Sequence, residues 1–310
     1  MRLAYFGLPL AACLLLRDGH EIALAALSPV DAPGRRRLRR RLGAERLLDA
    51  ATLGGELEPA VDAALARAGV DLVVSWFWTR RLPERWLSAG PLGAIGVHPS
   101  LLPRHRGPDP FFWAIDCGDE LTGACLHRLT PDYDAGDVLL QEELPVEHRN
   151  AWALARALDR PALRLLREGV ARLSRGDKLP GTPQDERSAS WAPEPAGELL
   201  RVRWSWPTQR VLCRVRALSP VPGVAIEVAG QKLFVTQARA ADWAPTLLEP
   251  GEAALLGDPP GALVIRTGDG ALQIEQALAA PGGEQLDGAG VASRVAERGM
   301  LDCVPLGGNG

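Results

Sequence analysis

The beginning of the chain places a short apolar helix between two apolar strands, and this order restricts the possible folds more than any other feature. Leu3–Phe6 is predicted to be a buried strand, Pro9–Arg17 a helix and Glu21–Leu27 a second strand. Strand, helix and strand at this spacing indicate two parallel strands joined by a right-handed crossover. Further strands are predicted over residues 71–77 and 94–97. We therefore expect an α/β fold with a doubly wound, mostly parallel sheet.

Length and composition narrow the class of protein. A chain of 310 residues, 46% of them hydrophobic, indicates two domains, or one large one, with ample material for a core. The net charge of -3 gives no general attraction to polyanions. The cysteines are scattered without a C-x-x-C pair, which argues against a disulfide framework or a zinc site and fits a reducing compartment. No apolar run reaches the ~20 residues of a membrane span, so we expect a cytoplasmic protein with no metal and no membrane partner.

The stretch from residue 93 to residue 142 contains the side chains with the clearest chemical potential. His98 ends a predicted strand, and Asp134 lies in the predicted turn Tyr133–Gly136. An aspartate beside a histidine fixes the tautomer of the ring and stabilises the imidazolium, which makes a catalytic pair. The pattern by itself favours a plainer interpretation, a loop histidine and a turn-forming aspartate, because short motifs have high false-positive rates.

The sequence HPSLLPRHRG followed by YDAGD resembles the hallmark of the folate-dependent formyltransferases, which include enzymes that act on methionyl-tRNA, on glycinamide ribonucleotide and on amino sugars. The family motif is Asn-x-His before the SLLP loop, with an aspartate in a later turn. His98 and Asp134 match that histidine and that aspartate, but Gly96 stands where the family has asparagine. The resemblance implies 10-formyltetrahydrofolate as co-substrate. It also implies a small OB-like β-barrel domain after the α/β domain.

The resemblance assigns roles to these three positions. An acceptor amine attacks the formyl carbon, an oxyanion forms, and the folate nitrogen leaves. His98 is expected to polarise the formyl oxygen or relay protons, while Asp134 orients the ring and takes the proton of the amine. Loss of one oxyanion donor at Gly96 typically costs ~2.7–4 kcal/mol. We still expect an active enzyme, because the His–Asp pair is present, and we expect asparagine at position 96 to speed turnover unless the glycine makes room for an acceptor.

The resemblance also implies two sets of contacting residues. Those expected against the folate are Leu82, Pro83, Ile95, Ser100, Leu102, Pro131, Asp132 and Gly136. Those expected to contact the acceptor are Trp76, Trp78, Arg80 and Arg106. Packing on the two faces of a strand end explains the two tryptophans equally well, and the two arginines could equally lie on the surface.

The domain pattern leaves several functions open. We expect a catalytic domain over 1–175, a linker over 176–200, an OB-like domain over 201–304 and a disordered tail over 305–310. The last domain and the basic run Arg35–Arg41 point to tRNA, although a solvated helix face explains the run as well. Gly96 and the Trp-rich segment favour a specialised small-molecule amine, which we expect to be the acceptor more than tRNA. The alternatives are a methionyl-tRNA formyltransferase and a noncatalytic folate- or tRNA-binding protein.

Overall fold

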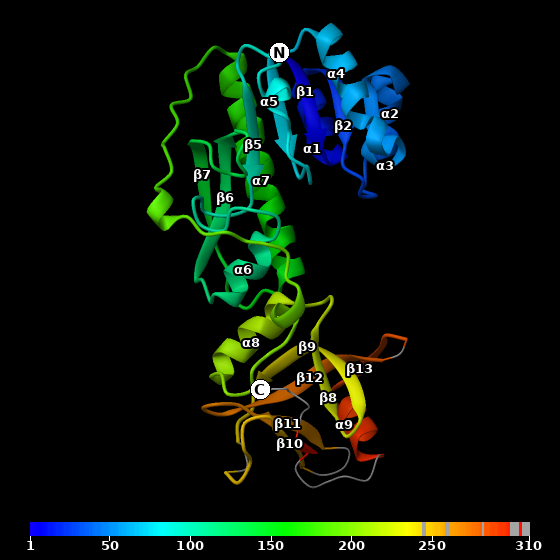
Figure 1. Cartoon of the computed structure of the whole chain (residues 1–310), viewed down its shortest axis with the longest axis vertical. Coiled ribbons are helices and arrows are strands. Elements are labelled where there is room, and N and C mark those ends of the chain that lie inside the picture. Colours follow the sequence, from blue (N-terminus) through cyan, green and yellow to red (C-terminus); the bar gives the residue numbers. More distant parts are fainter. Residues whose placement is uncertain (244–245, 258–260, 281, 298–303, 306–310) are drawn as a thin grey trace. The chain divides into compact units, whose positions relative to one another are not determined.

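The structure is a computed structural model that describes residues 1–243, 246–257, 261–280, 282–297 and 304–305. The chain divides into two compact units (Figure 1). The first comprises residues 1–110, 121–145 and 157–193, and the second comprises 111–120, 146–156 and the chain from 194 onward. Each unit therefore takes up more than one stretch of sequence, and the predicted domain limits stay a prediction.

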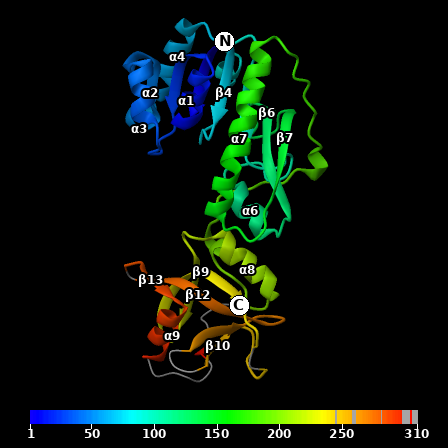
Figure 2. The same cartoon turned by 180° about the vertical axis from the view of Figure 1, so that it is seen from behind.

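The first unit contains a sheet whose strand order is β3-β2-β1-β4-β5-β6-β7 (Figures 1 and 2). The first five strands in this order are parallel, and β6 and β7 join the edge in antiparallel register. The predicted doubly wound, mostly parallel sheet is confirmed. In chain order the strands are β1 (Arg2–Gly7), β2 (Glu21–Leu27), β3 (Leu47–Asp49), β4 (Leu72–Trp76), β5 (Ala94–His98), β6 (Leu121–Arg128) and β7 (Val138–Pro145).

Helices cover both faces of this sheet, so its central strands are continuously apolar. On β1, Leu3 and Tyr5 pack into one core and Ala4 and Phe6 into the other. The first core is completed by α1 (Pro9–Arg17), α2 (Arg35–Leu42) and the later part of α7 (Ala151–Ser174). The second is completed by α3 (Ala50–Leu53), α4 (Leu57–Ala68) and α5 (Glu84–Leu87). Short 3-10 helices are η1 (Ala44–Arg46), η2 (Gly54–Glu56) and η3 (Glu186–Ser188).

The second unit is built on a curled antiparallel sheet with the order β14-β10-β11-β12-β9-β8 and with β13 paired to β12. This agrees with the predicted small OB-like domain. Pro305, expected to begin a disordered tail, pairs with Glu252, and 306–310 lie outside the described residues. The elements are α6 (Pro110–Asp116), η4 (Gly197–Leu200), α8 (Thr208–Ala217), β8 (Val224–Val228), β9 (Gln231–Ala240), β10 (Glu252–Leu256), β11 (Ala262–Arg266), β12 (Ala271–Ala279), β13 (Glu284–Asp287), α9 (Gly288–Ala296) and β14 (Val304–Pro305).

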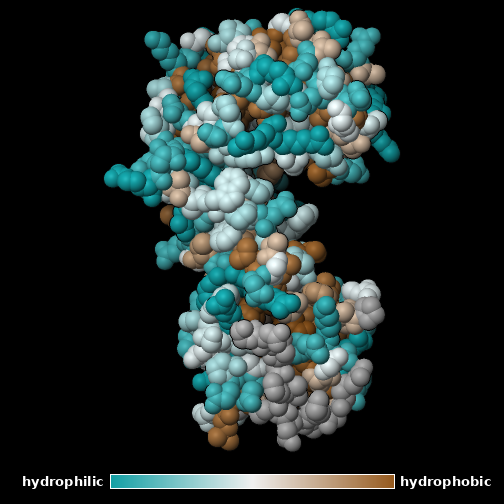
Figure 3. All heavy atoms as spheres, viewed as in Figure 1, coloured by the Kyte–Doolittle hydropathy of each residue, from teal (hydrophilic) through white to brown (hydrophobic). Residues whose placement is uncertain are grey.

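Among the described residues, none of the helices combines the length and the apolar character that a membrane span requires. Hydrophilic residues predominate over the face of the first unit drawn in Figure 3, with hydrophobic residues in scattered patches. This is the ordinary mixture found on globular proteins.

Candidate active site

The structure brings His98 and Asp134 together inside the first unit. His98 is the last residue of β5, and Asp134 lies in the turn between β6 and β7. Nδ1 of His98 is 3.4 Å from Oδ2 of Asp134, and both side chains are mostly buried. The backbone of Asp134 is left-handed, with φ 52°, a conformation that aspartate tolerates better than most residues. The predicted convergence is therefore observed, and the catalytic role of the pair stays a prediction.

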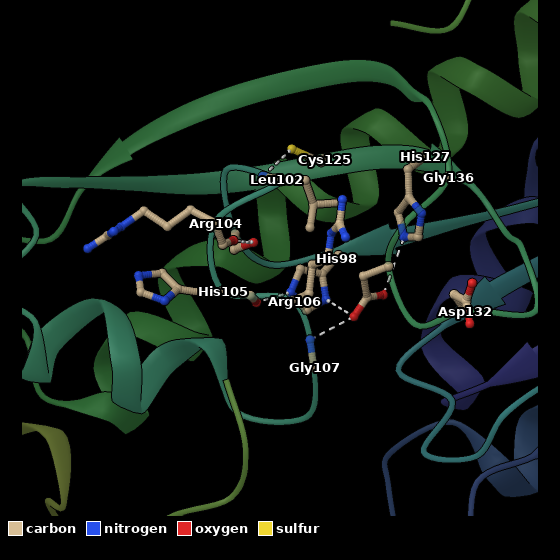
Figure 4. Close-up of polar contacts among 12 residues, drawn as sticks. His98, Leu102, Arg104, His105, Arg106, Gly107, Cys125, His127, Asp132 and Gly136 are labelled. Atoms are coloured by element: carbon tan, nitrogen blue, oxygen red, sulfur yellow. Dashed lines mark hydrogen bonds and ion pairs between the residues drawn. The ribbon is translucent and has the colours of Figure 1, made fainter. Parts of the chain in front are cut away.

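Backbone and amide groups from two other segments hold the Asp134 turn, and Figure 4 shows the one from Gly107. The N–H of Gly107 donates to Oδ2 of Asp134 at 2.9 Å. Gly107 has φ +117°, and a Cβ there would lie 3.1 Å from the carbonyl oxygen of Ala192, so both conformation and space favour glycine. The side-chain amide of Gln184 donates to the carbonyl oxygens of Asp134 at 2.7 Å and Gly136 at 2.6 Å. Gln184 was not identified from the sequence, because it lies in the segment that was interpreted as a linker.

The partners of the His98 ring determine where its protons lie. Nε2 is 2.7 Å from the carbonyl oxygen of His105, which can only accept, so Nε2 carries a proton. Nδ1 faces the Asp134 carboxylate, which also accepts when it is ionised. Both acceptors are satisfied together only when the ring carries two protons. The arrangement therefore suits a histidine that gains and releases a proton beside a carboxylate.

A second histidine faces the other oxygen of the same carboxylate. Nε2 of His127 is 3.6 Å from Oδ1 of Asp134, and Nδ1 is 2.9 Å from the carbonyl oxygen of Arg128. His127 is 2% exposed, and burial lowers its pKa to about 4, against the opposing influence of Asp134. The ring is therefore neutral near pH 7. The sequence suggested a structural histidine here, and its proximity to Asp134 was missed. The strand register places His127 opposite Gly96, and this pairing was the signal that could have revealed it.

The space beside Gly96 is filled by a neighbouring side chain. A Cβ at position 96 would lie 2.8 Å from Cδ2 of Leu129, and Leu129 packs at the edge of the second core. A side chain at position 96 therefore requires Leu129 to move. The glycine does not open a pocket for an unusual acceptor, because Leu129 occupies that space.

The residues predicted to contact folate come from segments that meet. Arg81, which precedes Leu82 and Pro83, lies 3.8 Å from the carboxylate of Asp132, so the first segment adjoins the 131–136 turn. Ile95 is fully buried on a strand that is paired on both sides, and its contact with folate stays a prediction. Two other predicted residues lie in the loop that follows His98. Ser100 donates to the carbonyl oxygen of Arg104 in the same loop, and the N–H of Leu102 donates to Sγ of Cys125 on β6.

The residues predicted to contact the acceptor are used mostly for packing. Trp76 is 3% exposed and belongs to the first core. Trp78 packs edge-on against Phe6, with ring centroids 5.5 Å apart. Arg80 is exposed. Their contact with an acceptor stays a prediction.

Arg106, the fourth of these residues, is committed to partners within the chain. Its guanidinium donates to the side chains of Gln184 and Glu186 at 2.8–3.0 Å. It thereby fastens the segment that carries Gln184 to the loop after His98. A substrate contact by Arg106 stays a prediction, and the observed contacts give it a positioning task.

The first unit is a mostly parallel α/β sheet with His98 and Asp134 at a strand end, and an antiparallel β sheet forms the second unit. Residues 17–158 match the formyl transferase family, and residues 197–294 match the formyl transferase C-terminal domain. The chain belongs to the formyltransferase family.

Curated relatives match over nearly the whole chain. The methionyl-tRNA formyltransferase of Ralstonia nicotianae is 32% identical over 92% of this chain and 92% of its own length. The methionyl-tRNA formyltransferase of Anaeromyxobacter dehalogenans strain 2CP-C is 34% identical over 83% of this chain and 85% of its own. The expectation that a small-molecule amine is the acceptor more than tRNA is therefore wrong. It gave weight to Gly96 as an opening for an unusual acceptor, and Leu129 fills that opening.

Solved structures share the fold. HypX from Aquifex aeolicus in complex with tetrahydrofolic acid superposes with a TM-score of 0.65 at 24% identity, covering 96% of this chain and 48% of the HypX chain. This chain thus spans about half of HypX. An N-formyltransferase from Helicobacter canadensis, in complex with folinic acid and dTDP-3-aminofucose, also gives 0.65, at 12% identity over 88% of this chain and 98% of that one. At these identities the likeness concerns the fold.

Proposed function

We propose that this protein transfers the formyl group of 10-formyltetrahydrofolate to the amino group of methionyl-tRNA. The observation that carries the proposal is the similarity of both units to methionyl-tRNA formyltransferases, with 32% identity over 92% of each chain. The His98–Asp134 pair then supplies the chemistry. The activity that was an alternative on the sequence alone becomes the main one.

The residues of the first unit fit a folate. The Leu82–Pro83 segment adjoins the turn around Asp132 through the Arg81–Asp132 ion pair, and the backbone groups of these two loops suit a flat heterocycle. The indole Nε1 of Trp78 is buried and has no acceptor among the described residues. A buried donor without a partner is costly, and a ligand acceptor would satisfy it. When bound, the folate supplies a formyl carbon open to attack by an amine.

Proton movements are assigned to the pair. Among the described residues, Asp134 accepts one hydrogen bond shorter than 3 Å, from Gly107, and so retains lone pairs for the proton that the attacking amine releases. Both ring nitrogens of His98 already face acceptors, so the ring can stabilise the negative charge on the formyl oxygen only through its positive charge when it holds two protons. Gly96 has no side chain that could donate to the formyl oxygen, so stabilisation of its negative charge depends on His98.

A basic helix supports the choice of tRNA as acceptor. Leu38 anchors α2 in the core, and Arg35 pairs with Asp49. The other arginines of the helix are exposed to solvent: Arg36, Arg37, Arg39, Arg40 and Arg41. A row of exposed guanidinium groups favours phosphate contacts even though the whole chain is slightly acidic.

The test is formation of formylmethionyl-tRNA. Purified protein is mixed with 10-formyltetrahydrofolate and methionyl-tRNA, and the product is measured by its resistance to deacylation under mild alkali. Transfer to methionyl-tRNA that falls steeply with salt supports the proposal. Release of formate without an acceptor, or folate binding with no turnover on methionyl-tRNA, would contradict it.

A further inference from the structure

Two large aromatic side chains lie exposed beside the catalytic pair. Tyr133 is 42% exposed and precedes Asp134 in the chain, and Trp191 is 52% exposed. Their ring centroids are 5.9 Å apart, with an interplanar angle of 53°. We call Tyr133, Trp191 and the neighbouring Arg81 the aromatic surface.

Both rings are held in place by the residues that hold the site. The N–H of Arg106 donates to the carbonyl oxygen of Ser190 at 2.9 Å, and the N–H of Ala192 donates to the carbonyl oxygen of Arg106 at 2.7 Å. These two bonds fix the backbone on both sides of Trp191. The outer edge of the indole lies 3.1 Å from the position a Cβ would take on Gly107. Gly107 in turn bonds the carboxylate of the residue after Tyr133. The exposed rings are therefore held in defined positions before a ligand binds.

A positive charge accompanies the rings. The guanidinium of Arg81 lies 4.8 Å from the centre of the Tyr133 ring. Its side chain is 60% exposed and reaches the carboxylate of Asp132 only at 3.8 Å. Such an exposed ion pair contributes little, and the guanidinium can exchange it for a phosphate. Rigid aromatic faces with an adjacent cation are the chemistry that binds single-stranded nucleotides.

We propose that the aromatic surface binds the 3′-terminal nucleotide of the acceptor RNA, with the base stacked on Trp191 and Arg81 near a phosphate. This rests on the proposed function, because the amine must be carried by an aminoacyl ester on that terminal ribose. When the amine reaches Asp134, the attached nucleoside lies within one nucleotide's length of it. Tyr133 is adjacent to Asp134, and Trp191 contacts Tyr133, so the aromatic surface lies within this reach.

The experiment combines a protein change with a substrate change. Trp191→Ala and wild type are each assayed on methionyl-tRNA and on the same tRNA with the terminal base removed. Stacking of one base corresponds to roughly a 5- to 150-fold effect, so Trp191→Ala should lower kcat/KM on intact tRNA by an amount in that range. On the base-free tRNA the variant and wild type should agree within about twofold, and Trp191→Phe should recover most of the loss.

Controls separate stacking from damage. Trp152→Ala removes another exposed indole, on α7, and should leave kcat/KM unchanged. An equal loss for Trp191→Ala on both tRNAs would overturn the inference, because it would show that Trp191 only supports the loop. Tetrahydrofolate binding to Trp191→Ala is measured by isothermal titration calorimetry. A loss of affinity would also overturn the inference and assign the surface to folate. A wild-type protein inactive on methionyl-tRNA would instead defeat the proposed function, and this inference with it.

Discussion

Two carboxylates, the buried Asp116 in the second unit and the mostly buried Asp134 in the first, are held in opposite ways. Asp116 is 3% exposed and accepts four hydrogen bonds from Arg210 and Arg214, at 2.5–3.0 Å. Asp134 accepts one hydrogen bond, from Gly107 at 2.9 Å, and meets its two histidines only at 3.4 and 3.6 Å.

Asp116 is saturated by its partners. Burial alone would raise the pKa of this carboxyl, but hydrogen bonds from Arg214 and then Arg210 outweigh burial and hold the pKa below its ordinary value. Arg214 also donates to the carbonyl oxygens of Leu199 and Arg201 at 2.8 Å, so the ion cluster closes on itself. No lone pair of Asp116 is left for a ligand, and its contribution is to the stability of the second unit.

The difference teaches how to tell a structural carboxylate from a reactive one. Both lie largely out of solvent, and what separates them most clearly is the number of hydrogen bonds that each accepts. A carboxylate whose lone pairs are all used stabilises the fold, whereas one that is positioned but under-coordinated can still accept a proton from a substrate.

Removal of His98 gives the largest expected effect. His98→Ala should lower formyl transfer by roughly 10²–10⁴-fold, because it removes the proton donor beside Asp134. The thermal unfolding curve should show a folded protein with a moderately lower midpoint. His148→Ala, which removes an exposed histidine, is the matched control. Transfer that stays within tenfold of wild type in the His98 variant would place the chemistry elsewhere.

Removal of the saturated carboxylate should act on stability. Asp116→Ala leaves the buried guanidinium of Arg214 without its counter-ion, which should cost about 3–5 kcal/mol in the free energy of unfolding. Chemical denaturation measures this loss. The control is Asp177→Ala, which breaks the exposed pair with Arg175 and should cost less than about 1 kcal/mol. If the two variants lose the same stability, the buried ion cluster of Asp116 contributes no more than a surface ion pair, and its structural assignment is wrong.

The neutral histidine beside Asp134 predicts a pH dependence of stability. The pKa of His127 is about 4 in the folded protein, whereas its ordinary value, expected in the unfolded chain, is ~6.5. Between these values the unfolded state holds more protons, so the free energy of unfolding should fall as pH falls, by up to about 1.4 kcal/mol per pH unit. His127→Gln should flatten this slope between pH 6.5 and 4.5 in denaturant titrations. Identical slopes in variant and wild type would show that His127 is not buried in its neutral form.

The order of elements in the first unit could be predicted because local patterns determine it. The helix predicted over Pro9–Arg17 has the same bounds in the structure, and the strand predicted over Glu21–Leu27 does too. Apolar runs of strand length separated by a helix have few alternatives in an open sheet. The convergence of His98 and Asp134 followed from the resemblance and not from periodicity.

The contacts around the site could not be predicted, because they depend on how distant segments cross. Gln184 reaches the Asp134 turn only through the path of a segment without regular patterning. Trp76 was expected to contact the acceptor, but alternation along β4 sends its side chain into the core. For the same reason the sequence could not show that Leu129, which follows a different strand, fills the space beside Gly96.

A substitution at position 96 gives the smallest expected effect on kcat, and it tests whether the His98–Asp134 pair works without a second donor. Gly96→Asn alone should change kcat little, because its Cβ would meet Leu129 at 2.8 Å and the amide would be displaced. In a Leu129→Ala background the amide has space beside the formyl oxygen, and kcat should rise about tenfold over Leu129→Ala alone, part of the effect of one oxyanion donor. Single-turnover rates at saturating folate and tRNA separate this gain from binding. An equal gain in the single variant would show that Leu129 yields freely, and no gain in either would mean that charge on the formyl oxygen is already stabilised by His98 without a second donor.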